Sequence, residues 1–203
     1  MSAEKMYIKN DTDPAEIPEI TEFFECILDV LRNNSEFKDV KNIRILDTKL
    51  TPPYISLVDR LIRFNSNIQR IEIDLRELRH DVSKKSAFAD FVSQLVDTIQ
   101  TFNTSLTNLN FLFLGEDGPE LARLNQVLAQ NQSIATLRQY LQQHPAAQSD
   151  ELPREVLMLL ADQLIVQGCK SGQSEQAVKA GLNEFLMSVQ AGRLNVPIRQ
   201  PVQ

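Results

Sequence analysis

Residues 57–73 read Leu-Val-Asp-Arg-Leu-Ile-Arg-Phe-Asn-Ser-Asn-Ile-Gln-Arg-Ile-Glu-Ile, and the spacing of the apolar residues changes within this stretch. Before Asn65 the apolar residues lie three or four positions apart, as they do on one face of a helix. From Ile71 they alternate with polar residues, which is typical of a strand with one buried face. The stretch therefore predicts a helix, a turn and a short strand.

The same pattern recurs along the chain. Segments of the form apolar-x-x-apolar-x-apolar begin at residues 40, 68, 106 and 134, which are 28, 38 and 28 residues apart, although Gln139 breaks the last one. Three of them follow an asparagine by three residues, and these asparagines are Asn65, Asn103 and Asn131. Prolines at 14, 52 and 119 mark the starts of the preceding helices. We interpret the middle spacing as the 28-residue period with an insertion of ten residues.

One helix and one strand of this size cannot bury their apolar faces alone, so the units are expected to stack into a parallel sheet with helices along one side. The strand and helix-end patterns over residues 20–141 resemble leucine-rich-repeat proteins of the ribonuclease-inhibitor-like subclass. This resemblance implies an α/β fold: a short leucine-rich-repeat solenoid of about four degenerate repeats, closed by a C-terminal helical pair. It also implies a protein that binds other proteins.

The domain organisation follows from these patterns. We expect a flexible N-terminus at 1–13, the repeat domain at 14–141 with an opening helix at about 14–32, and a linker at 142–150. A helical cap follows at 151–191, with helices at about 152–166 and 175–190, and a tail occupies 192–203.

Composition and charge narrow the function. The net charge of -6 disfavours a nucleic-acid partner, and the longest apolar run, Val156 to Ala161, is too short for a membrane helix. The N-terminus shows no secretory signal pattern. Cys26 and Cys169 are expected to be buried free thiols, which suits a cytoplasmic location in the producing cell or in a host cell.

Candidate chemistry is sparse. The two histidines, His80 and His144, lack metal-ligand spacing, and the six glycines form no phosphate-binding loop. We therefore expect no catalytic residue, no metal site and no cofactor, and the sequence leaves the oligomeric state open.

The residues between the apolar positions of each strand are expected to point outward and to form the partner-binding face. The predicted residues of this face are Arg44, Leu46, Arg70, Glu72, Asp74, Asn108, Asn110, Leu112, Arg138 and Tyr140. The predicted function is a non-catalytic protein–protein interaction module, with a bacterial effector as one form of it.

Two alternatives stay open. Leu152-Pro-Arg-Glu-Val-Leu157 resembles the opening of an F-box, which implies a ubiquitin-ligase adaptor that uses the C-terminal helices. The second alternative is an enzyme whose site is assembled in space and is not visible in the sequence.

Overall fold

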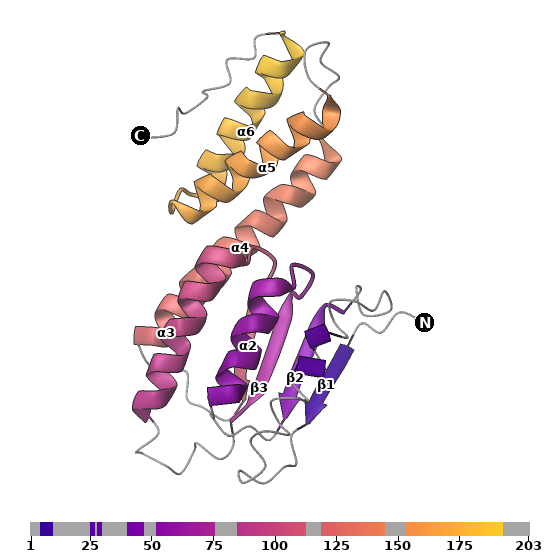
Figure 1. Cartoon of the computed structure of the whole chain (residues 1–203). Coiled ribbons are helices and arrows are strands. Elements are labelled where there is room, and N and C mark those ends of the chain that lie inside the picture. The colour runs from indigo at the N-terminus through magenta and orange to yellow at the C-terminus, as the bar shows by residue number, and fades with distance from the viewer. Residues whose placement is uncertain are drawn as a thin grey trace, which may run out of the picture. The chain divides into compact units, whose positions relative to one another are not determined.

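The computed structural model describes residues 5–9, 25–26, 28–29, 40–46, 52–75, 85–112, 119–144 and 153–192. Figure 1 shows the elements, whose order is β1 (Lys5–Lys9), β2 (Asn42–Leu46), α2 (Pro52–Phe64), β3 (Arg70–Asp74), α3 (Lys85–Phe102), β4 (Asn108–Leu112), α4 (Pro119–Gln143), α5 (Arg154–Lys170) and α6 (Glu175–Gln190). Two compact units divide the chain, Met1–Gln132 and Ser133–Gln203, and the division falls inside α4.

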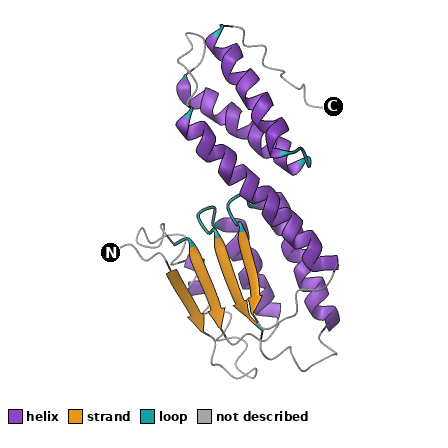
Figure 2. Ribbon diagram, turned by 180° about the vertical axis from the view of Figure 1, so that it is seen from behind, coloured by secondary structure: helices purple, strands orange, loops and turns teal. Residues whose placement is uncertain are grey.

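The first unit contains a parallel sheet of four strands in the order β1-β2-β3-β4. The predicted strands at 43, 71 and 109 lie side by side in it, because Ile43 is in register with Ile71 and Ile71 with Leu109. Figure 2 shows helices against one face of the sheet. The alternating apolar residues of the strands point to that face, where Ile71 and Ile73 are fully buried.

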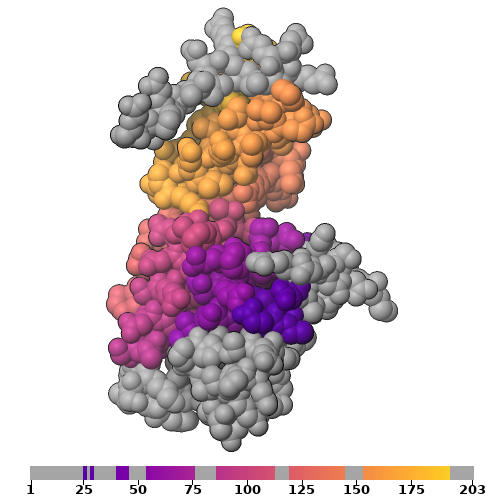
Figure 3. Space-filling view, viewed as in Figure 1, coloured from indigo at the N-terminus to yellow at the C-terminus, as the bar shows by residue number. Residues whose placement is uncertain are grey.

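Helices α2 and α3 cover the sheet because their apolar residues repeat at helical spacing. Leu57 and Leu61 of α2 and Val92 and Val96 of α3 are buried in the same core cluster as the strand isoleucines. Each such side chain contributes about 1.5–3 kcal/mol of transfer free energy when it leaves water. Figure 3 shows that α2 and α3 form much of the surface on this side of the unit.

A buried asparagine side chain connects the turn after α2 to the turn after α3. The Asn103 amide nitrogen donates hydrogen bonds to the carbonyl oxygens of Ile62 at 2.8 Å and Asn65 at 3.3 Å. Its side-chain oxygen accepts from the backbone N–H groups of Ser105 at 2.8 Å and Leu106 at 2.7 Å. Four polar backbone groups of the two turns are thus paired by a single side chain.

Asn131 repeats half of this arrangement one unit later. Its amide nitrogen donates to the carbonyl oxygens of Asn103 at 3.2 Å and Leu106 at 2.8 Å. Asn131 is 1% exposed and Asn103 is 2% exposed. Asn103 therefore connects two successive turns, and Asn131, which lies inside α4, connects this helix to the turn before β4.

The prediction of a leucine-rich-repeat solenoid is wrong. The described chain is mostly helical, and the fourth predicted strand, 134–139, lies inside α4. The physical reason is that Ile134, Leu137 and Leu141 are spaced three and four apart, and all three are buried in a helical core. Ile134 and Leu137 match the first two apolar positions of the repeated segment as well as helical spacing, while Gln139 stands where the strand needs an apolar side chain.

In the described residues of the second unit, the regular elements are helices. Its core joins the last turns of α4 to α5 and α6 through Ile134, Leu137, Leu141, Leu157, Ala161, Ile165, Cys169, Val178, Leu182, Leu186 and Val189. The two predicted C-terminal helices are confirmed as α5 and α6, and Ser174 caps α6 by accepting a hydrogen bond from the Ala177 N–H at 3.2 Å. Residue 168 is a glycine where α5 meets the Val178 side chain of α6.

Other elements were missed or lie outside the described residues. Strand β1 falls inside the N-terminus that was predicted to be flexible, at 1–13. Of the opening helix predicted at 14–32, only 25–26 and 28–29 are described, and these are helical. Most of the predicted linker and tail lie outside the described residues, although α4 continues through Gln143. Among the helices that the structure describes, none has both the length and the hydropathy needed to span a bilayer.

The two thiols differ in exposure. Cys169 is buried as predicted, but Cys26 is exposed, which corrects the expectation that both are buried. Burial, and secondarily the negative charge of Glu175, raises the pKa of the Cys169 thiol. The reactive thiolate is therefore disfavoured at Cys169.

We expect the exposed Cys26 thiol to react rapidly with an alkylating reagent at neutral pH, and the buried Cys169 thiol to react only after unfolding. The raised pKa keeps the Cys169 thiol protonated over a wider pH range, which further slows its labelling in the folded protein. Mass spectrometry of the labelled peptides over time measures both rates. Cys26→Ser and Cys169→Ser variants serve as matched controls, and equal rates at the two positions would contradict the expectation.

Candidate protein-interaction surface

The side of the sheet opposite the helices carries a polar surface, which we call the outer sheet face; its described residues are Asn42, Arg44, Arg70, Glu72, Asn108, Asn110 and Leu112. Strand alternation places these side chains there, because their neighbours Ile43, Ile71 and Leu109 point to the core. The parallel register sets them in rows across the strands. Arg44 stands beside Glu72, and Glu72 stands beside Asn110.

A single carboxylate lies between two guanidinium groups on this face. The Glu72 Oε1 atom lies 2.6 Å from the terminal nitrogen of Arg70, and its Oε2 atom lies 3.6 Å from Nε of Arg44. The Arg44 and Arg70 side chains are 44% and 47% exposed. Such exposed pairs contribute little to folding, typically about 0–1 kcal/mol.

The structure corrects the predicted face at three positions. Asp74 follows the outward alternation of β3 but is fully buried. Arg138 and Tyr140 lie in α4 and not on a strand. Leu46 lies at the end of β2, and its side chain is outside the described residues. The remaining predicted residues, which are Arg44, Arg70, Glu72, Asn108, Asn110 and Leu112, share the outer sheet face.

Arg138 and Tyr140 instead stabilise the helical unit. Arg138 binds Asp162 of α5 through two nitrogens, at 2.6 and 2.9 Å, and this hydrogen bonding raises the pKa of the guanidinium. The Tyr140 hydroxyl donates to Oδ1 of Asn183 in α6 at 2.9 Å. These two side chains therefore fasten α4 to both following helices.

Tyr140 also has a partner on its ring. The Nζ atom of Lys179 lies 4.1 Å from the ring centroid, which is the geometry of a cation–π contact. The His144 ring stacks on Tyr140 with centroids 4.2 Å apart, and Nδ1 of His144 lies 3.0 Å from the Tyr140 carbonyl oxygen. His144 is thus engaged with its own helix, while His80 lies outside the described residues.

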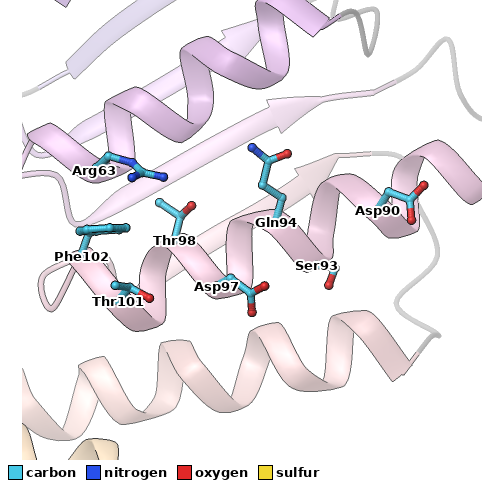
Figure 4. Close-up of a pocket in the computed structure, with 8 residues that line it drawn as sticks. All are labelled: Arg63, Asp90, Ser93, Gln94, Asp97, Thr98, Thr101 and Phe102. Atoms are coloured by element: carbon cyan, nitrogen blue, oxygen red, sulfur yellow. The ribbon is translucent and has the colours of Figure 1, made fainter.

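An open groove of about 450 Å³ lies on the helical side of the first unit, and Figure 4 shows its lining. Sequence reasoning did not find it, because its residues come from α2 and α3 and share no motif. The Arg63 guanidinium carbon lies 4.2 Å from the centroid of the Phe102 ring, and Arg63 pairs with Asp59 at 3.3 Å. Thr98 donates a hydrogen bond to Asp59. The lining residues are Arg63, Asp90, Ser93, Gln94, Asp97, Thr98, Thr101 and Phe102.

The groove lining offers hydroxyl groups and the carboxylates of Asp90 and Asp97, and it includes neither histidine nor cysteine. In the part of the chain that the structure describes, no three or more histidine, cysteine, aspartate or glutamate side chains are grouped to hold a metal ion. No protein-family model, curated protein or solved structure matches this chain.

Proposed function

We propose that this chain binds a protein partner through the outer sheet face and acts without catalysis. The observation that carries the proposal is the row Arg44–Glu72–Asn110, which presents two charges and an amide on three adjacent strands. The row stands on a rigid base, because the neighbouring strand residues are buried in the core. Arginine is enriched among the residues that dominate binding energy at protein interfaces.

The surface favours a partner with acidic and amide groups. Among the described residues of this face, the exposed charges belong to Arg44 and Arg70, while Glu72 is half-buried and Asp74 is buried. A carboxylate from a partner can accept from the guanidinium nitrogens that Glu72 leaves free. Free cysteines support a cytoplasmic location as part of this proposal.

Reversing the charge of the two arginines tests the proposal. The Arg44→Glu, Arg70→Glu variant should bind a partner at least about tenfold more weakly, because both guanidinium groups are replaced by carboxylates. Candidate partners are first captured by the full chain, and the dissociation constant of each purified partner is then measured by isothermal titration calorimetry.

The matched control is Arg123→Glu on α4, which makes the same kind of charge change at a side chain that is 53% exposed. The control should keep the wild-type affinity. Equal loss of affinity in both variants, or loss in neither, would contradict binding through the outer sheet face. Thermal unfolding by circular dichroism checks that both variants remain folded.

A second candidate function rests on α5. Val156, Leu159 and Leu164 are 39%, 58% and 40% exposed, so three large apolar side chains of this helix face solvent. They lie in and after the stretch that resembles an F-box opening. An adaptor of ubiquitin ligases is therefore the partner that we propose for this helix.

The α5 candidate predicts that the full chain pulls down the ligase adaptor and that a Leu159→Ser, Leu164→Ser variant does not. Met187→Ser is the control, because Met187 is 62% exposed on α6 and outside the F-box-like stretch. Absence of adaptor binding by the wild-type chain would remove this candidate.

A further inference from the structure

The two edge strands of the sheet differ in how their sequences protect them. An edge strand exposes unpaired backbone N–H and C=O groups, and natural proteins commonly guard such edges with lysine or proline. Strand β1, Lys-Met-Tyr-Ile-Lys, has a lysine at each end. Strand β4, Asn-Leu-Asn-Phe-Leu, has neither a charge nor a proline. Strand β4 therefore lacks both of these protective features, and among the described residues no further strand pairs with its outer edge.

The backbone groups at the β4 edge can be identified from the bonds on its other side. Toward β3, the Asn108 N–H donates to the Gln69 carbonyl oxygen at 3.1 Å, and the Leu112 carbonyl oxygen accepts from the Leu75 N–H at 3.4 Å. Backbone direction alternates along a strand, so Asn110 also faces β3. The N–H and C=O groups of Leu109 and Phe111 therefore point to the open edge.

The apolar side chains of the core form rows across the strands, and the side chains at the β4 end of each row are more exposed than the others. Ile43 and Ile71 are 1% and 0% exposed, whereas Leu109 in the same row is 7% exposed. In the next row Ile45 and Ile73 are fully buried, but Phe111 is only partly buried. One more strand with apolar residues at these two positions would continue both rows.

We infer that this strand is β4 of a second copy of the chain, paired antiparallel about a two-fold axis at Asn110. In this register Leu109 of one copy lies opposite Phe111 of the other. The two-fold axis produces this pair twice, and the two residues of each pair exchange backbone hydrogen bonds. The N–H and C=O groups of Leu109 and Phe111 are therefore all satisfied in each copy. Shifting the axis to Leu109 would place Phe111 opposite Thr107, whose N–H already donates to the Gln69 carbonyl oxygen at 2.9 Å.

The side chains are self-complementary in the same register. Leu109 and Phe111 meet on the helix side, where they extend the core. The two Asn110 side chains meet on the outer face, where amides can pair without charge repulsion. A two-fold interface of this kind buries the same strand on both copies and closes at two subunits.

Sedimentation and site-specific crosslinking of the full chain test the inference. The wild-type chain should sediment as a dimer at concentrations in the hundreds of micromolar. In a Cys26→Ser background, Asn110→Cys should form an intermolecular disulfide with oxidised glutathione, which accepts the two electrons and is released as reduced glutathione. Non-hydrogen-bonded antiparallel pairs bring Cα atoms to about 4.5 Å, within the range that a disulfide accepts.

The matched control is Asn108→Cys on the same strand and face. In the proposed register the two Cα atoms at position 108 are separated by about four residues along the strands, roughly 14 Å, so they cannot form a disulfide. Crosslinking at 110 at least about tenfold faster than at 108, together with a wild-type dimer, supports the inference. A wild-type monomer at every concentration, even one that captures a strand from another protein, overturns it. A dimer without crosslinking at 110, or with equal crosslinking at 108, also overturns it.

Discussion

Alanine in place of Asn103 is expected to lower the free energy of unfolding by about 3 kcal/mol. The side chain is buried and makes four hydrogen bonds, two donated and two accepted, to backbone groups of two turns. Alanine leaves these backbone groups without their partner, and a buried unsatisfied group costs about 1–3 kcal/mol. The neighbouring backbone can relax, so the four costs do not add in full.

Urea unfolding followed by circular dichroism measures this loss. Asn65→Ala is the matched control, because the Asn65 amide nitrogen donates to the Leu61 carbonyl oxygen in its own helix, at 3.1 Å, and the residue is only partly buried. The control should lose no more than about 1 kcal/mol. An Asn103→Ala variant as stable as the Asn65→Ala variant would show that the turns do not depend on this side chain.

Alanine at position 168 is expected to destabilise the helical unit by about 2 kcal/mol, although alanine is the better helix former. A Cβ atom on Gly168 would lie 2.6 Å from Cγ2 and 3.1 Å from Cγ1 of Val178. Valine is branched at Cβ and has one preferred rotamer in a helix, so its methyl groups cannot swing aside. The two helices would have to separate to admit the methyl group.

Gly181 provides the control for this prediction. It lies in α6 with no atom within 4 Å of an added Cβ. Gly181→Ala should therefore raise stability by about 0.5–1 kcal/mol, in the opposite direction to Gly168→Ala. Adding Val178→Ala to Gly168→Ala should cost less than the sum of the two single changes, because the clash is removed. Additive effects in this double-mutant cycle, measured by urea unfolding, would contradict the proposed clash.

Local patterns predicted the elements whose apolar spacing is unambiguous. The strand residues around Ile43, Ile71 and Leu109 alternate over several positions, and prolines at 52 and 119 mark helix starts that the structure contains. The fourth segment resembled the other three locally, because Ile134 and Leu137 match the first two apolar positions of the repeated segment and also the spacing of a helix. The helix prevailed since Leu141 and the later helices α5 and α6 supply a core on that face.

The prediction of the partner-binding residues failed where it needed more information than the alternation of side chains along a strand. Alternation predicts on which side of a sheet a side chain lies, but it does not predict whether that side is covered. The burial of Asp74 was therefore not predicted. The positions of Arg138 and Tyr140 depended on the mistaken strand. The groove beside Arg63 and Phe102 joins residues that are far apart in sequence, so no local pattern indicates it.

Helix α4 has a consequence for how the protein can be dissected. Leu124, Val127 and Leu128 belong to the core of the first unit, and Ile134, Leu137 and Leu141 belong to that of the second. A fragment that begins at α5 would contain α5 and α6 but would lack the α4 residues that complete their core. No loop separates the two units, because their boundary falls inside α4. A truncated chain that loses binding would have lost either the binding residues or its fold. Point substitutions are therefore better suited than truncations to mapping a binding site.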